Sequence, residues 1–133
     1  MRIFIDTNVL LSAALFPDGV AACAYEVAVS SPHRPIISDY VISELRAVFE
    51  RKFPDKVPAL DRFLESFSNA VEIVATPNIA SSDEINVRDP ADRPVLRAAL
   101  ASNAEVLLTG DKGLLDSCID SLRIVSPREF LGL

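Results

Sequence analysis

The sequence predicts an α/β fold of three layers (α/β/α), with helices on both faces of a central, mostly parallel four- or five-stranded sheet. Short apolar runs alternate with longer segments of helical periodicity along the chain. Strands that are separated by helices form parallel sheets with both faces covered. The length of 133 residues suits a single domain, residues 1–133, with one hydrophobic core.

Five segments have the length and composition of strands. The run RIFI at 2–5 is apolar, and PIIS at 35–38 is too short for a helix. Residues 71–76 alternate in polarity, and the segments 106–110 and 122–126 are predicted as buried strands.

Helical segments fill most of the chain between these strands. Prolines or glycines mark the ends of several of these helical segments. The polar run at 79–86 is predicted to be a loop. Helices are predicted at 8–16, 20–30, 38–53, 58–69, 89–103 and 111–119, with a terminal helical turn from residue 127.

Composition narrows the classes of function. Half of the residues are hydrophobic, which is more than a disordered chain carries. The net charge is −6 and the pI is about 4.7, whereas a simple nucleic-acid-binding module normally has a basic face. An acidic protein can still act on a polyanion when metal ions in an acidic pocket contact the phosphate.

The sequence favours a cytoplasmic protein. Cys23 and Cys118 lie far apart and match neither a zinc site nor a disulfide framework, as expected in a reducing compartment. Asp6 interrupts the first apolar run, so no signal-peptide pattern is expected. No uninterrupted apolar stretch approaches the ~20 residues that span a bilayer, so no contact with a membrane is expected.

Three aspartates follow predicted strands: Asp6, Asp39 and Asp111. In an open parallel sheet, ligands bind at the carboxyl ends of the strands, so these side chains are expected at the functional edge. Each one can also be explained as a helix N-cap, because strand-to-helix turns need such caps. The interpretation of any single aspartate therefore stays open.

Two further acids are candidates for the same edge. Glu44 lies on the flank of the apolar stripe of its helix, and its stem could equally cover apolar surface. Asp92 is in line with the apolar stripe of the helix that follows it. Asp89 could cap that helix with Asp92 as the acid of a capping box, or Pro94 could delay the start of the helix so that Asp92 is the cap.

Several carboxylates held close together raise one another's pKa values unless a cation neutralises them. Oxygen ligands without histidine suit Mg²⁺ or Mn²⁺. Thr109 could bond to a carboxylate or be an ordinary β-branched strand residue, and Asn8 could orient Asp6 or simply occupy a first helical turn. The only histidine, His33, lies in a proline-flanked loop, so nucleophile activation by histidine is not expected.

Motifs for nucleotide cofactors are missing, since the chain has neither GxGxxG nor a P-loop. Four blocks in order do resemble a known family: IDTNVLLSA, SDYVISELRAVFERK, RDPADRPVLRAALASNAEVLLTGDKGLL and IVSPREFL. They are similar to the PIN-domain nucleases, and most similar to the VapC-like toxins of bacterial type II toxin–antitoxin modules. The resemblance extends from residue 2 to residue 131.

The resemblance implies a PIN-like fold and a Mg²⁺- or Mn²⁺-dependent ribonuclease. The four acids of the family match Asp6, Glu44, Asp92 and Asp111, which are therefore expected to be both catalytic and metal-binding. Asn8, Asp89 and Thr109 match auxiliary positions. Expected partners are RNA and a cognate antitoxin, and a homodimer or higher oligomer is expected. The alternatives are a catalytically silent PIN-like interaction module and a receiver-like, Mg-binding signalling domain.

Overall fold

A computed structural model describes residues 1–67 and 69–133. Within these residues, five strands form one parallel sheet in the order β3-β2-β1-β4-β5. This confirms the predicted three-layer α/β architecture, with every described strand parallel. The strands are β1 (Arg2–Ile5), β2 (Arg34–Ser38), β3 (Glu72–Val74), β4 (Val106–Leu108) and β5 (Arg123–Val125).

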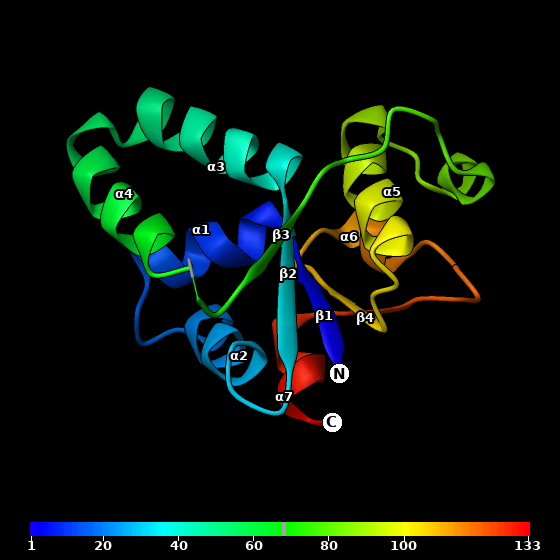
Figure 1. The fold of residues 1–133 in the computed structure, drawn as a ribbon, viewed down its shortest axis with the longest axis horizontal. Coiled ribbons are helices and arrows are strands. Elements are labelled where there is room, and N and C mark those ends of the chain that lie inside the picture. Colours follow the sequence, from blue (N-terminus) through cyan, green and yellow to red (C-terminus); the bar gives the residue numbers. More distant parts are fainter. Residues whose placement is uncertain (68) are drawn as a thin grey trace.

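Helices lie on both sides of the sheet, with α1 to α4 on one side and α5 and α6 on the other (Figure 1). The α-helices are α1 (Thr7–Leu15), α2 (Val20–Ala28), α3 (Asp39–Lys52), α4 (Val57–Glu65), α5 (Arg93–Ala101), α6 (Lys112–Leu115) and α7 (Pro127–Leu131). Shorter 3₁₀ helices are η1 (Pro54–Lys56), η2 (Ser82–Asn86) and η3 (Pro90–Asp92).

The central strand β1 fixes the site by its register. Ile3, Phe4 and Ile5 are fully buried, as expected for a strand that is covered on both faces. Ile5 pairs with Leu108 of β4, so both strands end at the same level of the sheet. The next backbone N–H, that of Asp6, donates to the carbonyl of Leu108 at 3.0 Å. Residues that follow β1 and β4 therefore lie side by side.

Several helices begin or end at other residues than the sequence predicts. The helix predicted at 89–103 begins as η3 and becomes α5 at Arg93, with Pro94 in its first turn, where the missing proline N–H costs no helical hydrogen bond. The loop predicted at 79–86 contains η2. The helix predicted at 58–69 includes residue 68, which lies outside the described residues; α4 ends at Glu65.

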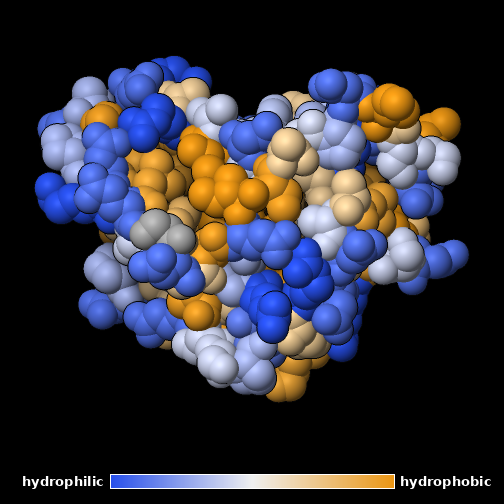
Figure 2. All heavy atoms as spheres, in the orientation of Figure 1, coloured by the Kyte–Doolittle hydropathy of each residue, from blue (hydrophilic) through white to orange (hydrophobic). Residues whose placement is uncertain are grey.

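Some hydrophobic side chains lie on the surface. Figure 2 shows them over the middle of the face seen in Figure 1, flanked by hydrophilic residues. Ile79 and Ile85, which flank the first turn of η2, are 84% and 81% exposed. No single described helix is both long and apolar enough to cross a bilayer; α1 and α2 satisfy that criterion only together, as a pair bent by 114°.

Candidate active site

Asp6 lies between β1 and α1 and is only 4% exposed. Its Oδ1 accepts a hydrogen bond from the backbone N–H of Thr7 at 2.7 Å, which makes it the N-cap of α1. Its Oδ2 accepts from Asn8 Nδ2 at 3.0 Å and from Thr109 Oγ1 at 2.8 Å. Asp6 therefore caps a helix with one carboxylate oxygen while the other is held in a polar cluster.

The electrostatic state of Asp6 is unusual. Burial raises the pKa of its carboxyl group from 3.8 to about 6, although the hydrogen bonds from Thr109 and Thr7 lower it. The negative charges of Glu44 and Asp111 raise this pKa further. A buried carboxylate with other acids near it is costly to ionise unless a cation compensates the charge.

Asn8 and Thr109 join the ends of β1 and β4. Asn8 Oδ1 accepts from the backbone N–H of Gly110 at 2.7 Å. Thr109, which is fully buried, accepts from the backbone N–H of Asp111 at 3.0 Å. Asp111 in turn caps α6 by accepting from the N–H of Leu114 at 2.9 Å. These bonds fix Asp111 relative to Asp6.

Glu44 reaches the cluster from α3. Its Oε1 accepts from Thr7 Oγ1 at 2.5 Å, so the helix that follows β2 is tied to the turn that follows β1. Sequence reasoning missed Thr7, which is buried. Its place directly after Asp6, in a turn without a loop, was the available signal.

The remaining acids come from η3. Asp89 caps this turn by accepting from the N–H of Ala91 at 3.0 Å. Asp92 is the N-cap residue of α5 but makes no capping hydrogen bond with its side chain. Burial raises the pKa of Asp92, and the charges of Asp111, Asp89 and Asp6 and a hydrogen bond with Asp111 raise it further. The carboxyl groups of Asp92 and Asp111 therefore meet.

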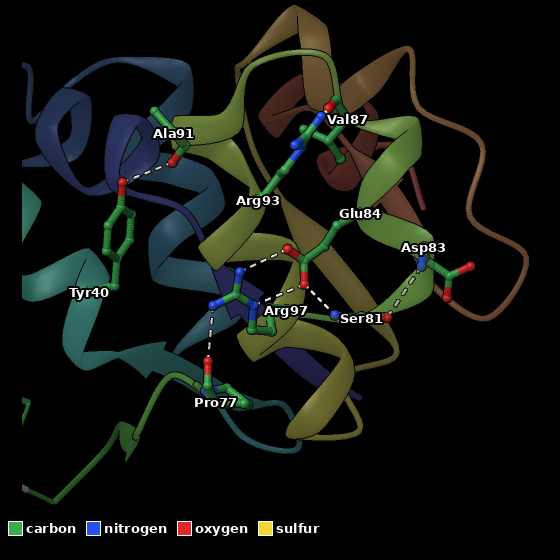
Figure 3. A network of polar contacts seen from close by, with 9 residues as sticks. All are labelled: Tyr40, Pro77, Ser81, Asp83, Glu84, Val87, Ala91, Arg93 and Arg97. Atoms are coloured by element: carbon green, nitrogen blue, oxygen red, sulfur yellow. Dashed lines mark hydrogen bonds and ion pairs between the residues drawn. The ribbon is translucent and has the colours of Figure 1, made fainter. Parts of the chain in front are cut away.

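A polar network holds the segment that carries η3 (Figure 3). The hydroxyl of Tyr40 on α3 donates to the carbonyl of Ala91 at 2.8 Å. Burial raises the pKa of Tyr40, followed by the charges of Glu44, Asp92, Asp6 and Asp89. The Tyr40 side chain thus spans from the helix of Glu44 to the residue before Asp92, a contact that the sequence did not reveal.

The same network contains a nearly buried ion pair. The Arg97 guanidinium donates to both carboxylate oxygens of Glu84 at 2.9 Å and to the carbonyl of Pro77 at 3.0 Å. Glu84 also accepts from the backbone N–H of Ser81. Nearby, Arg93 Nε donates to the carbonyl of Val87 at 3.0 Å. Arg97 thereby links α5 to Pro77, in the segment after β3, and to Glu84 in η2.

The structure brings the predicted site residues together at one edge of the sheet, but Asp39, which follows β2 at this edge, does not join them. The carboxylate of Asp39 accepts from Thr76 and Tyr40, and the Thr76 hydroxyl holds its pKa below the ordinary value. Ser38, not Asp39, is the N-cap of α3. The residues at the edge are Asp6, Glu44, Asp92 and Asp111, together with Asn8, Asp89 and Thr109.

The donor set suits a hard divalent cation in its chemistry, since all of its ligands would be oxygens. In the part of the chain that the structure describes, no three acidic, histidine or cysteine side chains could hold a metal ion as they stand. Asp6, Glu44, Asp92 and Asp111 would have to draw closer together around such an ion. Burial, and then the charges of neighbouring acids, raise the pKa values of Asp6 and Asp92, so a bound cation would favour their ionised forms.

Comparisons with known proteins identify the family and the fold. The sequence model of the PIN domain matches residues 2–113. No curated protein matches the chain. The VapBC2 structure from Rickettsia felis, bound to a promoter DNA fragment, is similar with a TM-score of 0.68 at 20% identity, covering 95% of this chain and 98% of that one.

Two further structures share the fold. DNA-bound VapBC from Salmonella typhimurium has a TM-score of 0.65 at 17% identity, covering 96% of this chain and 98% of the other. VapC20 of Mycobacterium tuberculosis, described as a toxin that cleaves the Sarcin-Ricin loop, has a TM-score of 0.60 at 16% identity, with coverages of 87% and 96%. From the match over residues 2–113, this chain belongs to the PIN-domain family.

Proposed function

We propose that the protein is a metal-dependent ribonuclease that hydrolyses phosphodiester bonds. The observation that carries this proposal is Asp6, a buried carboxylate with a pKa raised to about 6 and with further acids close by. Such an arrangement is costly for a fold and is typical of sites where a cation compensates the charge. Membership of the PIN-domain family supports the same reaction.

The acids would hold Mg²⁺ or Mn²⁺ through Asp6, Glu44, Asp92 and Asp111. A bound divalent cation supplies the positive charge that offsets the charge developing on the phosphate during hydrolysis. Thr109 and Asn8 orient the Asp6 carboxylate by donating hydrogen bonds to Oδ2. These two bonds hold the Asp6 carboxylate in place before substrate arrives, and such preorganisation contributes to the electrostatic stabilisation of a transition state.

The biological role that we propose is that of a toxin acting in the cytoplasm, together with a cognate antitoxin. Support comes from similarity in fold to two VapBC structures and to the toxin VapC20. In this role the antitoxin blocks the acidic edge of the sheet, and the toxin forms a homodimer or a higher oligomer.

The test is cleavage of labelled single-stranded RNA by the purified protein in Mn²⁺ or Mg²⁺. We expect cleavage that EDTA abolishes and that added metal restores. Asp6→Asn keeps the size of the side chain but removes its charge, and should lower the rate by at least ~10³-fold, a loss of about 4 kcal/mol of transition-state stabilisation.

Asp18→Asn is the matched control, because Asp18 is an exposed loop residue outside the site. It should cleave RNA at the wild-type rate. Cleavage by Asp6→Asn at that same rate, or wild-type cleavage that survives EDTA, would refute the assignment. Absence of cleavage with preserved binding of a protein partner would favour a silent interaction module. A mass increase after incubation with a small phosphodonor would favour a receiver-like domain.

A further inference from the structure

We propose that a polar cavity beside the acids binds a backbone phosphate of the substrate RNA. This phosphate is the neighbour, in the same strand, of the phosphate that is hydrolysed. This inference rests on the proposed ribonuclease function and specifies how an acidic protein holds a polyanionic strand. The cavity has a volume of about 470 Å³, within the ~300–1,000 Å³ of typical ligand sites. Its walls are formed by Asn86, Arg88, Lys112, Gly113, Asp116 and Ser117.

Gly113 joins this cavity to the acidic cluster. A Cβ atom at this glycine would lie 3.1 Å from Asp111 Oδ2 and 3.9 Å from Asp92 Oδ2. The wall of the cavity therefore lies next to two of the four acids. A strand whose scissile phosphate lies at the acids places a neighbouring phosphate within reach of the cavity, since only one ribose separates consecutive phosphates.

The two cations of the cavity are free to bind an anion. Arg88 and Lys112 are exposed, and among the described residues neither side chain makes a hydrogen bond or an ion pair. They lie within a protein of net charge −6 and next to the acids. A phosphate is a strong acceptor for both arginine and lysine donors.

Polar groups in the same wall fit the rest of a nucleotide. The side chains of Asn86 and Ser117 can donate to phosphate or ribose oxygens. Asp116 is the only acid among the residues that form the cavity, and it leaves one net positive charge there. Phosphate contacts of this kind position a strand without reading its bases. The cavity therefore contributes affinity and register rather than sequence preference.

The experiment compares two substrates, an RNA decamer and a dinucleotide with a single phosphodiester bond. The dinucleotide cannot fill the cavity while it occupies the acids. For Arg88→Ala/Lys112→Ala we expect KM for the decamer to rise by roughly fivefold per lost cation, with KM for the dinucleotide unchanged. The slope of log KM against log salt for the decamer should fall by about 0.7 per lost phosphate contact.

Arg51→Ala/Arg128→Ala is the matched control, because it removes the same charge from exposed positions on α3 and α7, outside the cavity. It should leave both KM values and the salt slope near those of the wild type. If Arg88→Ala/Lys112→Ala changes neither decamer KM nor its salt slope, the cavity is not a phosphate site although the nuclease stands. An equal rise in KM for both substrates would mean that the substitutions act through the acids, which also overturns the proposal.

A wild-type protein that does not cleave the decamer refutes the ribonuclease and this subsite with it. If the wild type cleaves the decamer but not the dinucleotide, the salt slope for the decamer is the deciding measurement. A smaller slope in Arg88→Ala/Lys112→Ala supports the phosphate contact, and an unchanged slope overturns it. Inorganic phosphate serves as a competitor: it should raise decamer KM for the wild type more than for Arg88→Ala/Lys112→Ala. Equal competition in both proteins overturns the proposal.

Discussion

The acids of the site are held in two different ways. Asp6 and Asp111 follow the central strands β1 and β4, and backbone pairing of those strands brings them together. Asp89 caps η3 and Asp92 is its last residue, after a segment that leaves the sheet at the end of β3. The sheet therefore places Asp6 and Asp111, which we call the sheet side of the site. Contacts that a loop makes place Asp89 and Asp92, which we call the loop side.

The contacts of the loop side are made by side chains. Tyr40 bonds to the carbonyl of Ala91, and Arg97 bonds to Glu84 and to the carbonyl of Pro77 (Figure 3). On the sheet side, by contrast, the groups of Asn8 and Thr109 only refine positions that the strands already set. Substitutions on the loop side should therefore alter the site through structure, and substitutions on the sheet side mainly through charge.

The largest effect is expected from Arg97→Ala. This change leaves the carboxylate of Glu84 without its cation, and the loss of stability should exceed that from breaking an exposed ion pair. The side chains of Arg97 and Glu84 are 20% and 5% exposed. The free energy of unfolding at pH 7, measured by urea denaturation, checks the loss.

Arg46→Ala is the control, since it breaks the pair with Asp61, whose side chains are 39% and 48% exposed, and should cost less than ~1 kcal/mol. Adding Glu84→Gln to Arg97→Ala removes the orphaned charge and should recover part of the loss. Equal losses for Arg97→Ala and Arg46→Ala would mean that the loop side needs no such anchor.

The second prediction concerns Asp6, on the sheet side, and the dependence of the free energy of unfolding on pH. A carboxyl group whose pKa is raised by folding stabilises the fold below its unfolded pKa, and this contribution is lost as pH rises through the folded pKa. For Asp6 the window runs from 3.8 to about 6, equivalent to about 3 kcal/mol. Metal-free protein should therefore become more stable as pH falls from about 6 to about 4.

Groups with lowered pKa values act in the opposite direction at lower pH. Hydrogen bonds from Arg97 and Thr76 hold the pKa values of Glu84 and Asp39 below their ordinary values, so stability should decline again below pH ~4. Chemical denaturation in EDTA measures the profile. Asp6→Asn should remove the part of the rise that Asp6 contributes between about pH 6 and about pH 4, while the part due to the raised pKa of Asp92 remains. An unchanged profile in this variant would contradict the electrostatic account of Asp6.

The contrast between the two sides also decides what the sequence could reveal. Strand β1, the turn after it and Asp6 were predictable because the apolar run ends abruptly in a helix-capping residue. Parallel strands place their carboxyl ends at one edge, so the meeting of Asp6 with Asp111 followed from topology. The prediction that Asp6 binds metal stays a prediction.

The loop side was less predictable, since its contacts join residues far apart in the chain. Nothing local to Tyr40 shows that its hydroxyl reaches Ala91. Glu84 belongs to the predicted polar loop, and yet it is only 4% exposed. The pattern Ser81 followed by Glu84 was a readable capping box, and the structure contains it. Its pairing with Arg97, by contrast, depends on how α5 packs.

The smallest effect should come from Tyr40→Phe, which removes only the hydroxyl that bonds to the carbonyl of Ala91. We expect a loss of about 1 kcal/mol in the free energy of unfolding. Because this bond lies one residue before Asp92, kcat for RNA cleavage should also fall by roughly tenfold, as small displacements of catalytic groups lower rates steeply. Urea denaturation and steady-state kinetics measure the two quantities.

Tyr25→Phe makes the same chemical change on α2, away from the acids, and should leave kcat unchanged. A rising Mn²⁺ concentration should restore part of the kcat of Tyr40→Phe if the hydroxyl acts by placing Asp92 near the other acids. The loop side would lose its role in positioning if Tyr40→Phe and Tyr25→Phe gave the same kcat. A fall in kcat without a change in the metal dependence would instead place the Tyr40 hydroxyl at the substrate.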